Sequence, residues 1–229
     1  MKTIGFIGGL TWHSSIDYYR LLNEMVNEKL GGAHSCQMLM YSVEFGEIKR
    51  LTFAEDWDGI ATIMCKAAAT LETAGADCIL LGANTMHNIA DKVAATINIP
   101  LIHIAEATAT EILKKKIKKI ALLGTKYTMQ MDFYKNKLAD QNIETLIPNV
   151  DDMEYINAAV YEEMGKGLFL PETKGRIIKI IKELQQQGAQ GVILGCTELP
   201  ILIKQEDISV PAFDTTLIHA KAAVEFVLQ

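Results

Sequence analysis

The sequence predicts an α/β protein built from two similar halves, each with a mostly parallel sheet. Short, nearly continuous apolar runs alternate with longer segments in which apolar residues recur every three or four positions. Such runs suit parallel strands that helices cover on both faces, and the alternation is typical of the α/β class. In addition, three short sequence segments of the first half recur, in the same order, in the second half.

The apolar runs and the helical periods predict the individual elements. The strand-length runs are residues 4–7, 38–40, 78–81, 101–102, 120–123 and 192–194. The clearest helix covers residues 60–74, because its apolar face begins after Glu55-Asp56 and ends at Gly75. Similar periods predict helices within residues 15–30, 130–141, 151–165, 173–187 and 215–228. The lysines within residues 114–119 suit a helix end, where cations interact favourably with the helix dipole.

An internal duplication predicts the domain organisation. GADCILLG at 75–82 matches GAQGVILG at 188–195 in four of eight positions, and Ile4–Gly8 resembles Ile120–Gly124. Ile99-Pro100 likewise resembles Val210-Pro211. Two copies of this length are domains rather than stacked repeats. We therefore expect one α/β domain in residues 1–103 plus 212–229 and a second in residues 104–211.

Composition narrows the function classes. The chain has 229 residues, 49% of them hydrophobic and 22% charged, which is ordinary globular composition. A net charge of −6 argues against a nucleic-acid surface. No apolar stretch reaches the ~20 residues that span a bilayer, and the N-terminus does not resemble a signal peptide. We expect a cytoplasmic protein whose four cysteines, which lack C-x-x-C spacing, are free thiols.

Four glycine-containing turns follow the predicted strands, two in each half. Ligands of open α/β sheets bind beyond the carboxyl ends of the strands, so we expect the site in the cleft between the domains. Glycines and hydroxyls at these turns suit a small carboxylate. The candidate residues are Gly9, Thr11, Thr85, Thr125, Thr128 and Thr197. The glycine spacing matches neither a dinucleotide fingerprint nor a P-loop, and the histidines lack metal-ligand spacing, so no nucleotide or metal site is predicted.

Cys196 ends one of these turns and is the cysteine with the best functional case. Thr197-Glu198-Leu199-Pro200 has the form of a helix start, and a helix N-terminus can lower the pKa of a nearby thiol from about 8.5. The alternative is that Cys196 is only a small residue at a strand end. Spacing alone leaves both interpretations open, whereas Cys65 and Cys78 fit the core.

Two turns together resemble a known family. Ala83-Asn84-Thr85-Met86-His87, paired with Gly195-Cys196-Thr197-Glu198, is similar to the aspartate/glutamate racemase superfamily and closest to its aspartate racemase branch. Supporting stretches are residues 4–24, 121–135, 187–200 and 211–220. The resemblance implies a homodimer that racemises an amino acid with no cofactor, neither pyridoxal phosphate nor metal. It also implies two cysteines on opposite sides of the substrate α-carbon, one acting as base and one as acid.

By this resemblance Cys196 is one of the pair, and the position of the missing first cysteine is Ala83, which has no titratable atom. Some members resemble this chain in lacking the first cysteine, with threonine in its place. The sequence therefore leaves three functions open. They are a racemase of aspartate, glutamate or a related amino acid; a single-cysteine decarboxylase or isomerase of a small carboxylic acid; and a catalytically impaired carboxylate-binding protein.

The resemblance also indicates how substrate is held and how a proton could replace that of the missing thiol. Asn84 and Thr85 are expected to bind substrate, and Arg50 and Lys166 to meet its carboxylates, with solvated surface charge as the alternative for these two. Glu198 is expected either to orient its neighbours or to interact favourably with the helix dipole. His87 or an ordered water is a candidate proton carrier on the side of Ala83.

Overall fold

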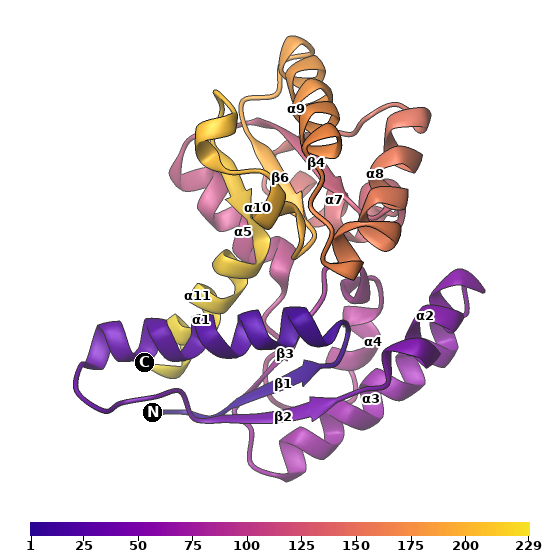
Figure 1. The fold of residues 1–229 in the computed structure, drawn as a ribbon. Helices are drawn as coiled ribbons and strands as arrows, with labels where there is room; N and C mark the ends of the chain where they lie inside the picture. The colour runs from indigo at the N-terminus through magenta and orange to yellow at the C-terminus, as the bar shows by residue number, and fades with distance from the viewer. The chain divides into compact units, whose positions relative to one another are not determined.

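The computed structural model describes all residues, 1–229, and divides into two compact units (Figure 1). Unit 1 comprises Met1–His103 and His219–Gln229, and unit 2 comprises Ile104–Ile218. The predicted α/β class with parallel sheets is confirmed. The second boundary differs from the 211/212 division expected from the sequence, because residues 212–214 form a strand of the unit 2 sheet. No helix is both long enough and apolar enough to cross a membrane.

Unit 1 is built on a three-stranded parallel sheet in the order β2-β1-β3. Its strands are β1 (Ile4–Gly8), β2 (Met38–Ser42) and β3 (Cys78–Leu81). A parallel bridge between Ile79 and Leu101 extends the sheet beyond β3. The helices are α1 (Trp12–Leu30), α2 (Phe45–Phe53), α3 (Trp57–Thr73), η1 (Thr85–Ile89), α4 (Ala90–Ala94) and the His219–Val227 part of α11 (Thr215–Val227).

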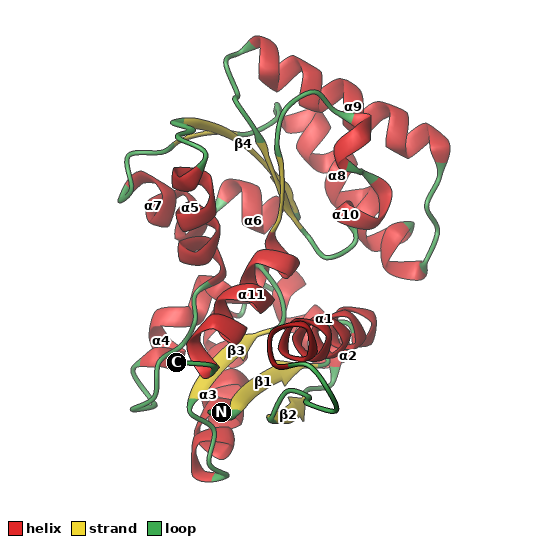
Figure 2. Ribbon diagram, turned by 90° about the vertical axis from the view of Figure 1, so that its left-hand side faces the viewer, coloured by secondary structure: helices red, strands yellow, loops and turns green.

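The two faces of this sheet bury alternate residues of its strands, as the two-residue period of a strand requires. Ile4 and Phe6 lie in one apolar cluster with residues of α1 and α11, whereas Ile7 lies in another with residues of α3. Figure 2 shows α1 and α11 on one side of the sheet and α3 on the other. This two-sided cover explains why the strands read as continuous apolar runs.

Unit 2 is built on a four-stranded parallel sheet in the order β5-β4-β6-β7. Its strands are β4 (Lys119–Gly124), β5 (Glu144–Leu146), β6 (Val192–Gly195) and β7 (Ala212–Asp214). The helices are α5 (Ile104–Lys114), α6 (Lys126–Gln130), α7 (Asp132–Ala139), α8 (Val150–Glu162), η2 (Met164–Lys166), α9 (Pro171–Gln186), α10 (Leu199–Leu202) and η3 (Gln205–Asp207). The first turn of α11 also belongs to this unit.

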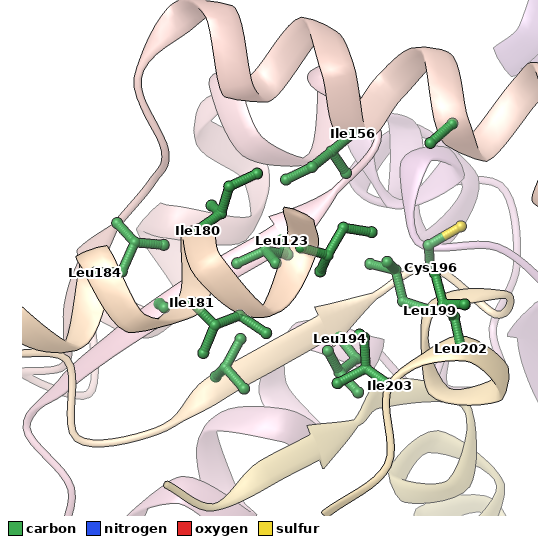
Figure 3. Close-up of a cluster of buried hydrophobic side chains, with 14 of the residues drawn as sticks. Leu123, Ile156, Ile180, Ile181, Leu184, Leu194, Cys196, Leu199, Leu202 and Ile203 are labelled. Carbon is green, nitrogen blue, oxygen red and sulfur yellow. The ribbon is translucent and has the colours of Figure 1, made fainter. Parts of the chain in front are cut away.

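One face of the unit 2 sheet leads directly to Cys196. Leu123 and Leu194 on this face pack with residues of α8 and α9, among them Ile156 and Ile181. Cys196 stands at the edge of the same apolar cluster, with its sulfur directed away from Leu194 (Figure 3). The core of unit 2 therefore forms one wall of the Cys196 environment.

The topology repeats the duplication seen in the sequence. The order β2-β1-β3 in unit 1 matches β5-β4-β6 in unit 2. The Ile79–Leu101 bridge holds the place that β7 takes beside β6, as the Ile99-Pro100 and Val210-Pro211 landmarks predict. The turns that follow β3 and β6 are therefore equivalent positions of the two halves.

Candidate active site

The Cys196 turn lies beside the turn that follows β4. Gly124 and Gly195 are partners in the register of β4 and β6, and the strands approach closely there. A Cβ atom on Gly195 would lie 2.8 Å from the backbone oxygen of Leu123. Glycine at this position therefore lets the two strand ends meet and brings the turn at Thr125 next to that at Cys196.

Cys196 and Glu198 form a buried hydrogen-bonded pair. Each residue is only 8% exposed. The thiol Sγ donates to Glu198 Oε2 at 2.7 Å, and the Thr197 hydroxyl donates to the same oxygen at 2.8 Å. Donation from both neighbours is the arrangement expected of a carboxylate, which has only acceptor sites. The pair holds a thiol proton within transfer distance of a base.

The expected lowering of the Cys196 pKa is wrong. Burial raises the pKa of this thiol well above its ordinary value, and the carboxylate of Glu198 raises it further. The backbone N–H groups of Glu198 and Leu199 oppose the shift but are outweighed. Helix α10 spans only Leu199–Leu202, so it supplies little dipole. In the resting site Cys196 is therefore a thiol, and Glu198 is its proton acceptor.

Two of the predicted threonines lie in the neighbouring turn after β4. Thr125 caps helix α6 by accepting from the backbone N–H of Thr128, and their hydroxyls lie 3.2 Å apart. Thr128 is fully buried and borders Gly195, since its Cγ2 would lie 3.3 Å from a Cβ atom there. Unit 2 therefore places Thr125 and Thr128 at the strand end beside Gly195, and Thr197 against Glu198.

Tyr161 is a member of this environment that sequence analysis missed. It lies in α8, and its phenol pKa is raised by burial and then by Cys196, Tyr127 and Glu198. This electrostatic coupling places Tyr161 near the Cys196–Glu198 pair. No motif marks it in the sequence, because its position depends on how α8 packs on the sheet.

In unit 1 the turns after β1 and β3 lie at neighbouring strand ends. Gly9 has φ +76, and a Cβ atom on it would lie 2.3 Å from the oxygen of Val43, so only glycine fits. Its backbone N–H donates to the Ser15 hydroxyl at 2.8 Å. Thr11 accepts from Ser14 N as the N-cap of α1. Both predicted residues therefore shape the turn, Gly9 through its backbone conformation and Thr11 through its side-chain cap.

The second turn of unit 1 carries Ala83, Asn84 and Thr85. Asn84 and Thr85 are 4% and 8% exposed, and Ala83 packs partly buried against the apolar cluster of unit 1. The backbone oxygen of Ala83 accepts from His87 Nδ1 at 3.0 Å. Methyl, amide and hydroxyl groups can hold a substrate here, but none is a thiol.

The two predicted cationic residues differ in their surroundings. Arg50 lies exposed on α2, which begins three residues after β2. Lys166 pairs with Glu162 at 2.6 Å, and both side chains are more than half exposed. An exposed pair of this kind contributes little energy, so Lys166 could exchange this partner for a ligand at small cost.

Comparison with known proteins decides the family. The family model described as Asp/Glu/Hydantoin racemase matches residues 7–223, almost the whole chain. The chain belongs to this family. It is 25% identical over 169 residues to the broad-specificity amino-acid racemase RacX of Bacillus subtilis, covering 74% of this chain and 73% of RacX.

Two solved structures are similar to this chain along its entire length. A crystal structure of a candidate Asp/Glu racemase from Yersinia pestis has 45% identity and a TM-score of 0.95, with 100% of both chains covered. The structure of an aspartate racemase homologue from Pyrococcus horikoshii has 40% identity and a TM-score of 0.88, again with 100% of both chains covered. These relatives support a racemase, and hence an isomerase, as the enzyme class.

Proposed function

We propose that this protein is an amino-acid racemase that needs no pyridoxal phosphate and acts on aspartate, glutamate or a related amino acid. The observation that carries the proposal is the 2.7 Å hydrogen bond from the Cys196 thiol to Glu198, in a chain of the Asp/Glu/Hydantoin racemase family. The proposed substrates follow from the relatives, which include an aspartate racemase homologue and a broad-specificity amino-acid racemase.

The pair supports proton transfer in both directions. In one direction the thiol proton moves to Glu198 Oε2, and the thiolate takes the α-proton of the substrate. The electron pair of the broken C–H bond remains on a planar carbanion, which the adjacent carboxyl group delocalises. In the other direction a base on the opposite face takes the α-proton, the thiol gives its proton to the carbanion, and the thiolate regains a proton from solvent by way of Glu198. Glu198 is the acceptor nearest to the thiol proton, at 2.7 Å, while its charge also raises the pKa that the transfer has to overcome.

Proton delivery to the opposite face needs a source other than residue 83. Ala83 has no exchangeable side-chain proton, and a threonine hydroxyl such as that of Thr85 is a weak acid and base without an activating partner. His87 is 2% exposed, and its Nδ1 is already bonded to the Ala83 oxygen. We assign this step to a water at the turn of residues 83–85, and the hydroxide that this water leaves is neutralised by the proton that Glu198 took from Cys196.

The test is incubation of each enantiomer of aspartate and glutamate in deuterated water, with α-proton exchange and chirality measured separately. Exchange accompanied by inversion is the expected result. Cys196→Ser should abolish both, whereas Cys65→Ser, at a thiol in α3, should change neither. Absence of exchange and inversion for every amino acid tried would refute the racemase proposal.

The absence of a thiol at residue 83 favours a second candidate, a single-cysteine decarboxylase. Such an enzyme needs only one proton donor, because loss of CO₂ generates the carbanion that the thiol then protonates. Release of CO₂ from a malonate-type acid, abolished by Cys196→Ser, would support it. Exchange with full retention of configuration would instead indicate that only the face of Cys196 works.

A further inference from the structure

Unit 1 contains a buried cluster of three histidines and a tyrosine directly behind the turn of residues 83–85. His87, His103 and His219 are 2%, 7% and 0% exposed, and Tyr18 is fully buried. The ring of His87 meets that of His103 edge-on at a centroid distance of 4.7 Å and that of His219 at 5.5 Å. These residues come from η1, the segment before α5, α11 and α1.

The hydrogen bonds fix the tautomer of two of the rings. His219 Nε2 lies 2.7 Å from the Ile102 carbonyl oxygen, which can only accept, so Nε2 carries a proton. Tyr18 then donates its hydroxyl proton to His219 Nδ1 at 2.8 Å. By the same reasoning His87 carries its proton on Nδ1, which faces the Ala83 oxygen at 3.0 Å.

Both rings are neutral at neutral pH. Burial lowers the pKa of His87 well below its ordinary value, and His103 and His219 lower it further. Burial also lowers the pKa of His219 to about 4. A neutral ring has one N–H, so the contact with the Ala83 oxygen commits His87 to the Nδ1–H form.

This bond determines the orientation of a peptide group in the candidate site. The peptide unit between Ala83 and Asn84 is planar and trans, so its C=O and N–H point to opposite sides. With the Ala83 oxygen held by His87, the Asn84 N–H points away from the histidine cluster. The side chains of Asn84 and Thr85 start from this same fixed unit.

We propose that His87 is a positioning residue, whose Nδ1–H holds the Ala83 carbonyl and so fixes the Asn84-Thr85 turn for substrate, while His103 and His219 hold its ring. The role in substrate binding rests on the proposed function, because Asn84 and Thr85 are its expected substrate contacts. The tautomer and the peptide orientation do not depend on it.

The first test is ¹⁵N NMR of the protein labelled at histidine, which distinguishes the two tautomers and the charged ring. We expect His87 as the neutral Nδ1–H form and His219 as the neutral Nε2–H form at pH 7. An Nε2–H or charged His87 would overturn the proposal whether or not the protein racemises amino acids. The exposed His34 is the internal reference for a solvated ring.

The second test compares His87→Asn with His87→Gln. The asparagine amide places a donor where Nδ1 lies, whereas the glutamine amide places it where Nε2 lies. We expect His87→Gln to shift the ¹³C resonance of the Ala83 carbonyl and to raise KM roughly fivefold, the loss of about one hydrogen bond, with kcat within about twofold. We expect His87→Asn to restore the resonance and most of KM.

The outcomes separate this proposal from the proposed function. Equal KM and an equal Ala83 resonance in both variants, with only a lower melting temperature, would show a merely structural role and refute positioning by His87. If the tautomer and the resonance behave as expected but no amino acid is exchanged, then the racemase proposal fails and the His87–Ala83 assignment stands.

Discussion

Acid should weaken unit 1 through His219. This ring is fully buried and carries its proton on Nε2 toward the Ile102 oxygen, so a second proton would place a charge in the apolar interior. Burial, opposed by the bond to Ile102 and reinforced by His103, lowers its pKa from 6.5 to about 4. Between these values the unfolded chain binds a proton that the folded unit does not. The free energy of unfolding therefore falls as the pH falls from about 6.5 to about 4.

The size of the effect follows from the two pKa values. The interval from 6.5 to about 4, at about 1.36 kcal/mol per pH unit, amounts to about 3 kcal/mol. Above pH 6.5 neither state binds the proton, and below pH 4 both do, so His219 contributes no slope there. With a urea dependence of about 2 kcal/mol/M, the expected loss is about 1.5 M in the unfolding midpoint.

The assay uses tryptophan fluorescence during urea unfolding at several pH values. Both tryptophans of the chain, Trp12 and Trp57, belong to unit 1, so the signal reports this unit. His219→Gln is the matched control, because its amide can still donate to the Ile102 oxygen but does not titrate. Carboxylates titrate in both proteins and cancel in the difference. An unchanged difference between the two proteins from pH 7 to pH 4 would refute the reasoning.

Substitutions at three further positions test the Cys196 environment. Glu198→Gln should speed alkylation of Cys196 by iodoacetamide, because it removes a charge that raises the thiol pKa, and slower alkylation would contradict this argument. The same substitution should slow α-proton exchange at least about 100-fold, because it removes the proton acceptor of Cys196. Gly195→Ala should lower the free energy of unfolding by about 1–3 kcal/mol, since the added Cβ would lie 2.8 Å from the Leu123 oxygen. Urea unfolding followed by circular dichroism measures this loss. By the same measurement, Ile181→Ala should lower the free energy of unfolding by about 2–5 kcal/mol and Ile181→Val by only about 0.5–1.5 kcal/mol, because this side chain is fully buried. Equal losses in the two variants would exclude a cavity effect.

Most of the fold could be predicted because its signals are local. Buried parallel strands produce apolar runs, and the 60–74 period marks α3 (Trp57–Thr73). The strands β5 and β7 were missed because each has three residues, and the polar Glu144-Thr145 pair begins β5. The place of β7 in the sheet depends on pairing with β6, which is distant in sequence. Such pairing also explains why the domain boundary was placed too early.

The site was predictable only where a motif carries it. Glycines at strand ends predict the turns that carry Cys196 and Thr125, and the structure has turns at these positions, whereas the roles of their residues in binding stay predictions. The direction of the Cys196 pKa shift was not predictable, because it depends on burial and on the rotamer of Glu198. Tyr161 and the histidine cluster depend on helix packing, which leaves no pattern in a single sequence.

The duplicated halves lead to a last prediction about residue 83. In the alignment of 75–82 with 188–195, Ala83 corresponds to Cys196 and Thr85 to Glu198, so unit 1 lacks both the thiol and its carboxylate partner. Ala83→Cys would therefore add a thiol whose pKa no carboxylate at residue 85 raises. By the family resemblance residue 83 is the position of the second cysteine, so we expect this thiol to supply a proton to the face that Cys196 does not serve.

We therefore expect Ala83→Cys to increase inversion relative to α-proton exchange in deuterated water, with Ala83→Ser as a control of similar size. Because exchange needs only Cys196 whereas inversion needs a donor on the second face, the ratio of the two isolates the missing group from any change in substrate binding. A folded Ala83→Cys protein that exchanges the α-proton at the original rate with an unchanged ratio would show that residue 83 does not limit racemisation. The proton for the second face would then already come from water held at the Asn84-Thr85 turn.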